Sequence, residues 1–396
     1  MSEQSKSLPP LDDLYRLPFF SDEDRAFVED LRGRLSDSAK IEIEGDGSAA
    51  LVAWVRRLGE WRTLETLFGN SIEDTSLLRV CLAREVLAEH CIIADLALVM
   101  QFLGGLPLYH GGSTFVAAAF DSIQQGKSVA AFAITEPEAG TDLSRISTSA
   151  TFDDGSYIIN GHKHLISNVG AADLFTLFAR LEGGDSTGRI AAFALPAEID
   201  GVTQIPTPPM VPHPIGRLEL NNVVLGKEHL LGVEGKGMRI ALETLGFCRP
   251  TVGAAANGMA RRAIAEAWEH VTTRQAFGGV LADKDLIKAG LSECIVDLDA
   301  ARLLVYRAAW ARDQAPKERH DRAASSAKWR ATESAQRVID KCLQFCGGVA
   351  TLQGHILAEL YQGLRPLRIY EGASEIHSLL VFDSLKGELG NVTKSP

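Results

Sequence analysis

The chain has 396 residues, of which 46% are hydrophobic and 23% are charged, and its formal net charge is −11. This length suits one large domain or two to three ordinary ones, and the composition is that of a globular protein and not of a disordered one. Because Lys and Arg are scattered along an acidic chain, an extended basic surface for nucleic acid is not expected.

No targeting or membrane-spanning segment is predicted. The chain begins MSEQSKSLPP, which lacks the basic start and the apolar core of a signal peptide. No run of eighteen apolar residues is present, so we expect no association with a membrane. Six dispersed cysteines, including Cys342 and Cys346 at helical spacing, are interpreted as small core side chains and not as metal ligands. They fit a reducing compartment, and a cytoplasmic protein is expected.

The first of three zones, residues 11–127, is predicted to be helical. In residues 75–99, for example, apolar side chains recur at helical spacing. Glycines and Pro107 between residues 104 and 112 then predict a loop between helices, because Gly and Pro interrupt regular structure. We therefore expect an N-terminal helical domain.

The second zone, residues 128–228, is predicted to be a small β domain, because short alternating runs replace the helical pattern. Residues 151–160 predict a hairpin with a tight turn at Asp154-Gly155. Prolines between residues 206 and 214 exclude a central strand there. The pattern predicts two more strands, at residues 174–179 and 189–195.

The third zone, residues 229–390, is predicted to be a helical bundle. Apolar residues between Ile287 and Ala308 step alternately by four and three, a seven-residue repeat typical of helices that pack along their length. Ala, Arg, Glu and Leu are frequent here, as helix propensity favours. The predicted order is a helical domain, a β domain and a helical bundle.

Six segments resemble the acyl-CoA dehydrogenase family and occur in the family's order. Any one of them alone is a weak signal, whereas all six in order are specific. The resemblance implies an α+β, acyl-CoA dehydrogenase-like fold with an N-terminal helical domain, a small middle β-barrel domain and a C-terminal four-helix bundle. The segments are AITEPEAGTD (133–142), INGHK (159–163), LLGVEGKG (230–237), RQAFG (274–278), QFCGG (344–348) and RIYEGASE (368–375).

The resemblance places Glu371 at the position of the family's catalytic base, between Tyr370 and Gly372 on the substrate side. A buried carboxylate with a raised pKa can remove the weakly acidic proton beside a thioester carbonyl. The next carbon then delivers a hydride to N5 of FAD, which leaves a 2,3-enoyl thioester. Arg249 resembles a family Arg near the base and the thioester. Some branches place the base where Cys248 stands, and a thiol does not suit this step.

The resemblance also assigns residues to FAD binding. Thr135 and Thr141 lie in the loop that hydrogen-bonds the flavin ring, with Thr141 also near the substrate carrier, and short hydroxyls suit a flat ring. Ser167 is placed toward flavin N5, whereas Leu165 stands where the family usually has a Trp. The remaining FAD-side positions are Arg274, Phe277, Gln344, Gly347, Gly348, Ser374 and Glu375.

Two of these segments imply an oligomer. In the family, Arg274 and Phe277 match residues that reach the adenosine diphosphate part of an FAD bound mainly by a neighbouring subunit, and 344–348 matches a segment facing the FAD tail. An Arg offers two parallel donors to a pyrophosphate, and Gly lets the backbone approach a ligand closely. The resemblance therefore implies a homo-oligomer, specifically a tetramer.

The leading hypothesis is an acyl-CoA dehydrogenase of fatty acid metabolism that passes electrons to an electron-transfer flavoprotein. Three alternatives stay open: an acyl group carried by an acyl-carrier protein in a biosynthetic pathway, flavin chemistry with oxygen, and a non-catalytic flavoprotein partner subunit. Two departures from the family leave the substrate open. Gln362-Gly363 stands where the family often has Arg-Asp, and residues 209–224 lack its usual polar stretch.

Overall fold

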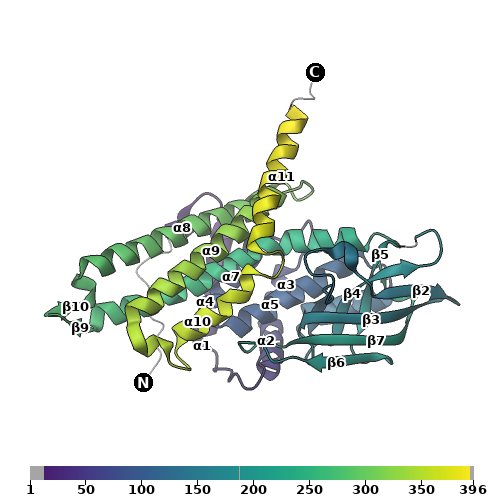
Figure 1. Cartoon of the computed structure of the whole chain (residues 1–396), viewed down its shortest axis with the longest axis horizontal. Coiled ribbons are helices and arrows are strands. Elements are labelled where there is room, and N and C mark those ends of the chain that lie inside the picture. The colour runs from purple at the N-terminus through teal and green to yellow at the C-terminus, as the bar shows by residue number, and fades with distance from the viewer. Residues whose placement is uncertain (1–12, 187, 393–396) are drawn as a thin grey trace. The chain divides into compact units, whose positions relative to one another are not determined.

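The computed structural model describes residues 13–186 and 188–392. The chain divides into two compact units, which contain the helices and strands labelled in Figure 1. Residues 1–12, which hold most of the segment judged not to be a signal peptide, lie outside the described residues. We call the units the sheet unit, made of Lys40–Thr75 and Leu96–Cys248, and the helical unit, made of Met1–Ala39, Ser76–Asp95 and Arg249–Pro396.

The sheet unit contains one eight-stranded sheet in the order β6-β7-β3-β2-β4-β5-β8, with β1 also paired to β4. β1 and β2 run parallel to β4, and the other neighbouring strands are antiparallel. The hydrogen-bonded path begins at β6 and ends at β8. The strands are β1 Ala130–Ala133, β2 Ser149–Asp153, β3 Ser156–Ser167, β4 Leu174–Glu182, β5 Ile190–Pro196, β6 Val202–Pro206, β7 Ile215–Gly226 and β8 Leu230–Leu231.

β4 and β5 lie inside the sheet because their sequences are almost continuously apolar. Nearly all their side chains are buried on both faces, as expected for strands that are covered on both sides. They confirm the strands predicted at 174–179 and 189–195. β2 and β3 confirm the predicted hairpin, in which Asp154 and Gly155 have φ angles of 42° and 84° and form the two-residue turn.

The loop predicted at residues 104–112 was wrong in its first part, because helix α5 (Ile92–Gly105) continues through Gly104 and Gly105, whereas Gly111 and Gly112 lie in the irregular connection before α6 (Thr114–Gln124). Close packing explains these glycines. A Cβ on Gly104 would lie 2.7 Å from the backbone nitrogen of Ala131 on β1, so only glycine lets α5 approach the sheet there. Gln101 reinforces this contact by accepting a hydrogen bond of 2.8 Å from the amide of Ala130.

Among the described residues, only Ile92–His110 is long and apolar enough to cross a membrane, and 83% of its apolar window is buried inside the protein. Such burial is typical of a core helix. The other helices of the sheet unit are α2 Ser48–Glu60, α3 Thr63–Leu67, η2 Leu106–His110, α6 Thr114–Gln124, η3 Leu143–Arg145, η4 Lys227–His229 and the first part of α7, which begins at Gly237.

The helical unit is a bundle in which α8 and α9 run side by side, and α11 begins beside α9 and then extends away from it (Figure 1). Residues 75–99 form two helices and not one, because Cys91 has an extended backbone between α4 and α5. The unit contains η1 Asp13–Arg16, α1 Asp22–Asp37, α4 Leu77–His90, α7 from Arg249 to Thr273, the pair β9 Gln275–Ala276 and β10 Gly279–Val280, η5 Leu281–Asp283, α8 Asp285–Gln314, α9 Asp321–Cys346, η6 Gly347–Thr351, α10 Ile356–Leu364, η7 Arg365–Arg368 and α11 Ser374–Val392.

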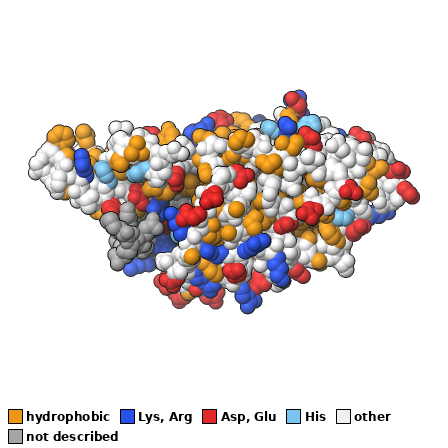
Figure 2. Space-filling view, turned by 90° about the horizontal axis from the view of Figure 1, so that it is seen from below, with side chains coloured by type: hydrophobic (Ala, Val, Ile, Leu, Met, Phe, Trp, Pro, Cys, Tyr) orange, Lys and Arg blue, Asp and Glu red, His pale blue; other side chains and the backbone are white. Residues whose placement is uncertain are grey.

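The seven-residue repeat of α8 faces the core of this bundle, as predicted. Leu291, Cys294 and Leu298 are buried with side chains from α7, α9 and α10, and Ile287 packs at the edge of the cluster. The predicted bundle therefore exists, held by a face of small and branched apolar residues. On the side of the molecule shown in Figure 2, Lys and Arg alternate with Asp and Glu, so the charge of that face is mixed.

Candidate active site

Glu371 lies in a short loop between η7 and α11, which we call the base loop (residues 369–373). Its backbone has a φ of 53°, in the left-handed region that only a few non-glycine residues adopt, and Gly372 follows with a φ of 100°. Gly372 is required for a second reason, since a Cβ there would lie 2.9 Å from Nε2 of His377. Left-handed backbone at a non-glycine residue outside a hairpin turn costs free energy and is enriched at active sites.

The carboxyl group of Glu371 is surrounded by three cationic side chains of the helical unit. Burial raises its pKa, and the positive charges of Arg84, Lys328 and Arg249 oppose that rise, while the carboxylate of Asp95 adds to it. Oε2 of Glu371 is enclosed and accepts no hydrogen bond from the described residues. The group therefore combines a raised basicity with a free lone pair, which is what a general base needs.

Arg84 is held rigidly on α4. Its Nε and Nη2 each donate a hydrogen bond of 2.7 Å to the two oxygens of Asp95, and Nη1 donates one of 2.9 Å to the hydroxyl of Thr251. Arg84 is fully buried. Burial lowers the pKa of its guanidinium, but Asp95 more than offsets this, so the pKa is raised and Arg84 stays charged. Its charge thus acts on Glu371 at every accessible pH.

Arg249 begins the part of α7 that belongs to the helical unit, directly before Pro250. The side chain is half-buried and its Nε has no hydrogen-bond partner among the described residues. Burial lowers the pKa of Arg249, whereas Glu371 and Asp321 raise it. An unpaired donor whose charge acts on Glu371 is available for a ligand oxygen, and the role that the resemblance implies for Arg249 stays a prediction.

The two segments predicted to face the flavin ring lie next to each other in the sheet unit. The backbone nitrogen of His164 donates a hydrogen bond of 2.9 Å to the carbonyl of Thr135. Directly behind them, Lys163 and Glu136 form a buried ion pair with 2.7 Å between Nζ and Oε1. This pair joins the TEP motif to the end of β3, although sequence reasoning gave neither residue a role.

Beyond the pair, β3 departs from regular geometry. The pairing of β3 with β7 is irregular between Lys163 and Ile166, and Leu165 there has a φ of 53° and is 54% exposed. The hydroxyl of Ser167 hydrogen-bonds Nε2 of His213 at 2.9 Å, and burial lowers the pKa of His213 to about 4, so this imidazole is neutral at pH 7. An exposed apolar side chain beside Ser167 fits a flat apolar ligand.

Three other predicted cofactor positions, Thr141, Ser374 and Glu375, are divided between the two units. Thr141 lies in an exposed loop of the sheet unit. Ser374 is buried and donates a hydrogen bond of 2.6 Å to Glu333, and Glu375 is exposed at the start of α11. The structure tests no ligand contact of these side chains, so their roles stay predictions.

Five predicted positions lie at the far ends of α7 and α9. Phe277 is 91% exposed with a φ of 51°, in the turn between β9 and β10, and Arg274 just before it is exposed. From Arg249 to Thr273, α7 rises roughly 36 Å at 1.5 Å per residue. The exposed end of α9 supplies Gln344, Gly347 and Gly348.

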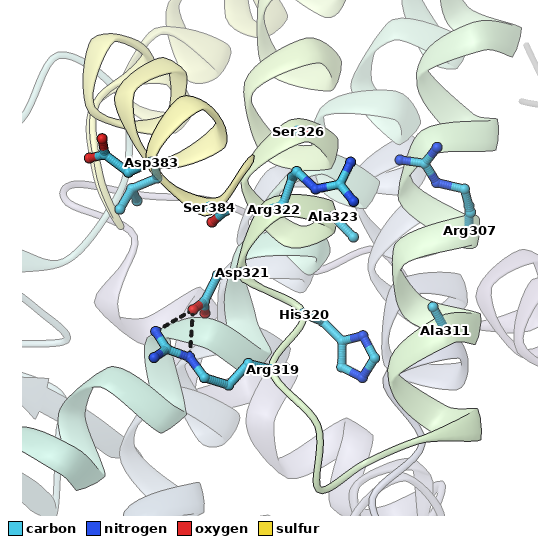
Figure 3. A pocket seen from close by; sticks show the side chains of 11 residues that line it. Arg307, Ala311, Arg319, His320, Asp321, Arg322, Ala323, Ser326, Asp383 and Ser384 are labelled. Carbon is cyan, nitrogen blue, oxygen red and sulfur yellow. Dashed lines mark hydrogen bonds and ion pairs between the residues drawn. The ribbon is translucent and has the colours of Figure 1, made fainter. Parts of the chain in front are cut away.

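A cavity of about 770 Å³ opens at the start of α9 and carries several cationic side chains (Figure 3). Arg307 of α8 and Arg319 and Arg322 beside the start of α9 line it, together with Asp321 and Asp383. Arg319 is paired with Asp321 through hydrogen bonds of 2.9 and 2.5 Å. Three guanidinium groups and two carboxylates leave the lining net positive, which suits an anionic ligand group.

Comparison with known proteins identifies the fold. The sequence model of the acyl-CoA dehydrogenase middle domain matches residues 131–223, and that of the C-terminal domain matches residues 235–386. The chain belongs to the acyl-CoA dehydrogenase family. It is 33% identical over 330 residues to a short-chain-specific acyl-CoA dehydrogenase of Megasphaera elsdenii, which covers 81% of this chain and 85% of the relative.

Two more similarities concern a sequence relative and a solved structure of the same fold. The chain is 30% identical over 285 residues to a subunit of a caffeyl-CoA reductase–Etf complex of Acetobacterium woodii, which covers 70% of this chain and 74% of the relative. A glutaryl-CoA dehydrogenase of Mycobacterium smegmatis, solved with FADH2, has a TM-score of 0.86 at 22% identity and covers 96% of this chain and 99% of its own. The predicted family, the α+β fold class and an oxidoreductase acting on CH–CH donors are thereby confirmed.

The assignment of Glu371 as the base stays a prediction, and apart from Arg249, sequence reasoning did not name the charged residues that act on its carboxyl group. Arg84, Asp95, Lys328 and His377 lie within helices, and no local motif marks them. Glu136 and Lys163 lie inside segments that the resemblance used, but their neighbours in the sequence are mostly polar and give no signal that the two side chains are buried together.

Proposed function

We propose that this protein removes two hydrogens from the carbons next to the carbonyl of an acyl thioester, with Glu371 as the base. The observation that carries the proposal is the enclosed, unpartnered Oε2 of Glu371 amid three cationic side chains. Burial raises the pKa of this carboxyl group and makes it a stronger proton acceptor, and the three cations oppose part of that rise. Arg249, whose Nε has no hydrogen-bond partner among the described residues, is proposed to donate a hydrogen bond to the negative charge that develops on the thioester oxygen.

FAD is the cofactor that family membership supports. Thr135, Leu165 and Ser167 fit the flavin ring, because one hydroxyl, one exposed apolar side chain and a second hydroxyl lie on adjoining segments of the sheet unit. The chemistry that bound FAD would supply is acceptance of a hydride from the substrate β-carbon. Glu371 ends the reaction protonated, and the thioester gains a Cα=Cβ double bond.

The carrier of the acyl group is proposed to be CoA. The net positive cavity around Arg307, Arg319 and Arg322 suits phosphate groups, which CoA carries and which an acyl-carrier protein presents only on its short prosthetic arm. The two relatives described above are named for CoA thioesters as different as short-chain and caffeyl substrates. The acyl group of the substrate is therefore expected to differ from one family member to another.

An electron-transfer flavoprotein is the proposed electron acceptor, since one relative is a subunit of a complex with such a protein. A homotetramer is the proposed assembly. The exposed Phe277 and the glycines at the end of α9 lie too far along the helices to serve the FAD of their own base loop, so a neighbouring subunit supplies that contact.

The test is anaerobic mixing of the FAD-loaded protein with a panel of acyl-CoA and acyl-carrier-protein thioesters, followed by flavin absorbance. We expect bleaching with at least one acyl-CoA and loss of bleaching in Glu371→Gln. Bleaching only with carrier-protein thioesters would assign the biosynthetic alternative. No bleaching with any thioester would leave a non-catalytic flavoprotein as the better description.

A further inference from the structure

All three carbonyl groups around the base are bound by two buried side chains. Lys328 of α9 donates hydrogen bonds to the carbonyl of Tyr370 at 2.6 Å and to that of Gly372. Nε2 of His377 lies 3.2 Å from the carbonyl of Glu371. Lys328 is 1% exposed and His377 is fully buried. These contacts involve the backbone, so they leave the carboxyl group of Glu371 free.

The ends of the base loop are tied to the same helix. Oε1 of Glu333 on α9 accepts a hydrogen bond of 2.8 Å from Nε of Arg368 before the loop and one of 2.6 Å from the hydroxyl of Ser374 after it. Helix α9 therefore holds both the ends and the middle of the loop. Burying a lysine costs free energy, because burial disfavours its charge. A buried lysine that binds two backbone carbonyls therefore indicates that these contacts matter to the protein.

We infer that Lys328 and His377 are positioning residues that hold Glu371 in its left-handed backbone conformation and thereby fix where its carboxylate accepts a proton. This inference rests on the proposed function of Glu371. Gly372 belongs to the same device, since any larger residue would strike the imidazole of His377. Left-handed backbone at a non-glycine residue costs free energy and persists only where its surroundings enforce it.

Lys328 has a second effect that His377 lacks. Burial lowers the pKa of Lys328 to about 8, so its ammonium group is mostly charged at pH 7 and opposes the burial-driven rise in the pKa of Glu371. Burial lowers the pKa of His377 to about 3, so this imidazole is neutral there. The other charged or titratable groups that act on Glu371 are Arg84, Arg249 and Asp95, which both substitutions below leave in place.

Two variants separate these effects. Lys328→Met removes both carbonyl contacts and the charge, whereas His377→Phe keeps the ring shape and removes only the donor. Lys328→Arg keeps the charge and serves as the conservative replacement. Lys341→Met is the matched control, because Lys341 is a lysine on the same helix that pairs with Glu293 at the surface.

The first measurement is amide hydrogen exchange of the peptide that contains the base loop, which needs no substrate. The amides of Ile369 and Tyr370 are bonded to the carbonyl of Pro366 and report on opening of this segment. We expect exchange to be roughly tenfold faster in Lys328→Met and in His377→Phe, because each loses hydrogen bonds of ordinary strength. The exchange rate in Lys341→Met should equal that of the wild type. Wild-type exchange in both variants would overturn the inference even if the enzyme had no dehydrogenase activity.

The second measurement is the pH dependence of flavin reduction by the best thioester. We expect Lys328→Met to react roughly 100-fold more slowly at pH 7, as misplacement of a catalytic group by about 1 Å does. The acid limb of the pH profile of Lys328→Met should move to higher pH, because the pKa of Glu371 rises when the ammonium group is removed. Flavin reduction in His377→Phe should be slower than in the wild type, with its acid limb at the wild-type pH. Lys328→Arg should also have its acid limb at the wild-type pH. An equal loss at all pH values in Lys328→Met, with an unmoved acid limb, would reduce Lys328 to a structural residue and contradict the inference.

Discussion

The substitution Lys163→Met tests whether the ion pair behind the predicted flavin segments stabilises the sheet unit. Both partners are buried, with 2% of Glu136 exposed and none of Lys163. Breaking a buried pair by removing one partner costs about 3–5 kcal/mol, since the remaining charge is left uncompensated. Glu136 would retain hydrogen bonds from the amide and hydroxyl of Ser147, each of 2.7 Å, and from the amide of Thr148 at 3.0 Å. We therefore expect the lower end of that range, about 3 kcal/mol.

For a folding unit of this size, each 1 kcal/mol shifts Tm by roughly 2–4 °C, so Lys163→Met should lower it by roughly 6–12 °C. Thermal unfolding followed by circular dichroism and by release of flavin fluorescence measures both unfolding and cofactor loss. The double variant Lys163→Met/Glu136→Gln should recover most of the loss, because no unpaired charge remains buried. Lys127→Met, at an exposed lysine of the same unit, is the control.

The pair also predicts a pH dependence. Burial alone would raise the pKa of Glu136, but Lys163 and the hydrogen bonds lower it from 4.5 to about 2. A carboxyl group with a depressed pKa stabilises the fold above its unfolded pKa, and this stabilisation is lost as pH falls from 4.5 toward 2. That loss should be smaller in Lys163→Met. A Tm decrease under about 2 °C, or a double variant less stable than the single one, would refute this reasoning.

Four further predictions follow from the site. Arg84→Met should destabilise the helical unit by about 3–5 kcal/mol, because Asp95 loses its partner, and should move the acid limb of flavin reduction to higher pH. Leu165→Trp should tighten FAD binding roughly three- to tenfold in a fluorescence titration, since a larger ring covers the flavin. Phe277→Ala should lower FAD retention and the share of oligomer on size-exclusion chromatography. Arg307→Ala should raise KM for acyl-CoA roughly tenfold without changing kcat, while a thioester of the short pantetheine arm is unaffected.

Local patterns predicted those elements whose geometry depends on neighbours in the sequence. The Asp154-Gly155 turn needs two residues with positive φ, and the α8 repeat needs one apolar face, so both can be read from the chain. The loop expected at Gly104 failed because the glycine serves close packing against Ala131 and not a turn. A glycine that forms a turn and a glycine that allows close packing look the same in the sequence. Only the neighbouring residues in the folded structure distinguish the two.

Interactions across long sequence separations could not be predicted. Lys328 contacts the carbonyl of Tyr370 across 42 residues, and Arg302 reaches Glu85 across 217. Contacts between residues so far apart in the sequence leave no periodic pattern in it. The same limit applies to the domain boundaries: the helical unit gathers three separate segments, while the three consecutive domains 11–127, 128–228 and 229–390 stay a prediction.

The central claim, that Glu371 takes the proton next to the thioester carbonyl, is tested most directly by proton exchange without oxidation. A thioester with hydrogens on the α-carbon and none on the β-carbon cannot be dehydrogenated, so only exchange of the α-proton with solvent can occur. In D2O, followed by nuclear magnetic resonance, the FAD-loaded protein should incorporate deuterium at the α-carbon and Glu371→Gln should not. Equal exchange by both proteins, with FAD bound to each, would contradict the account.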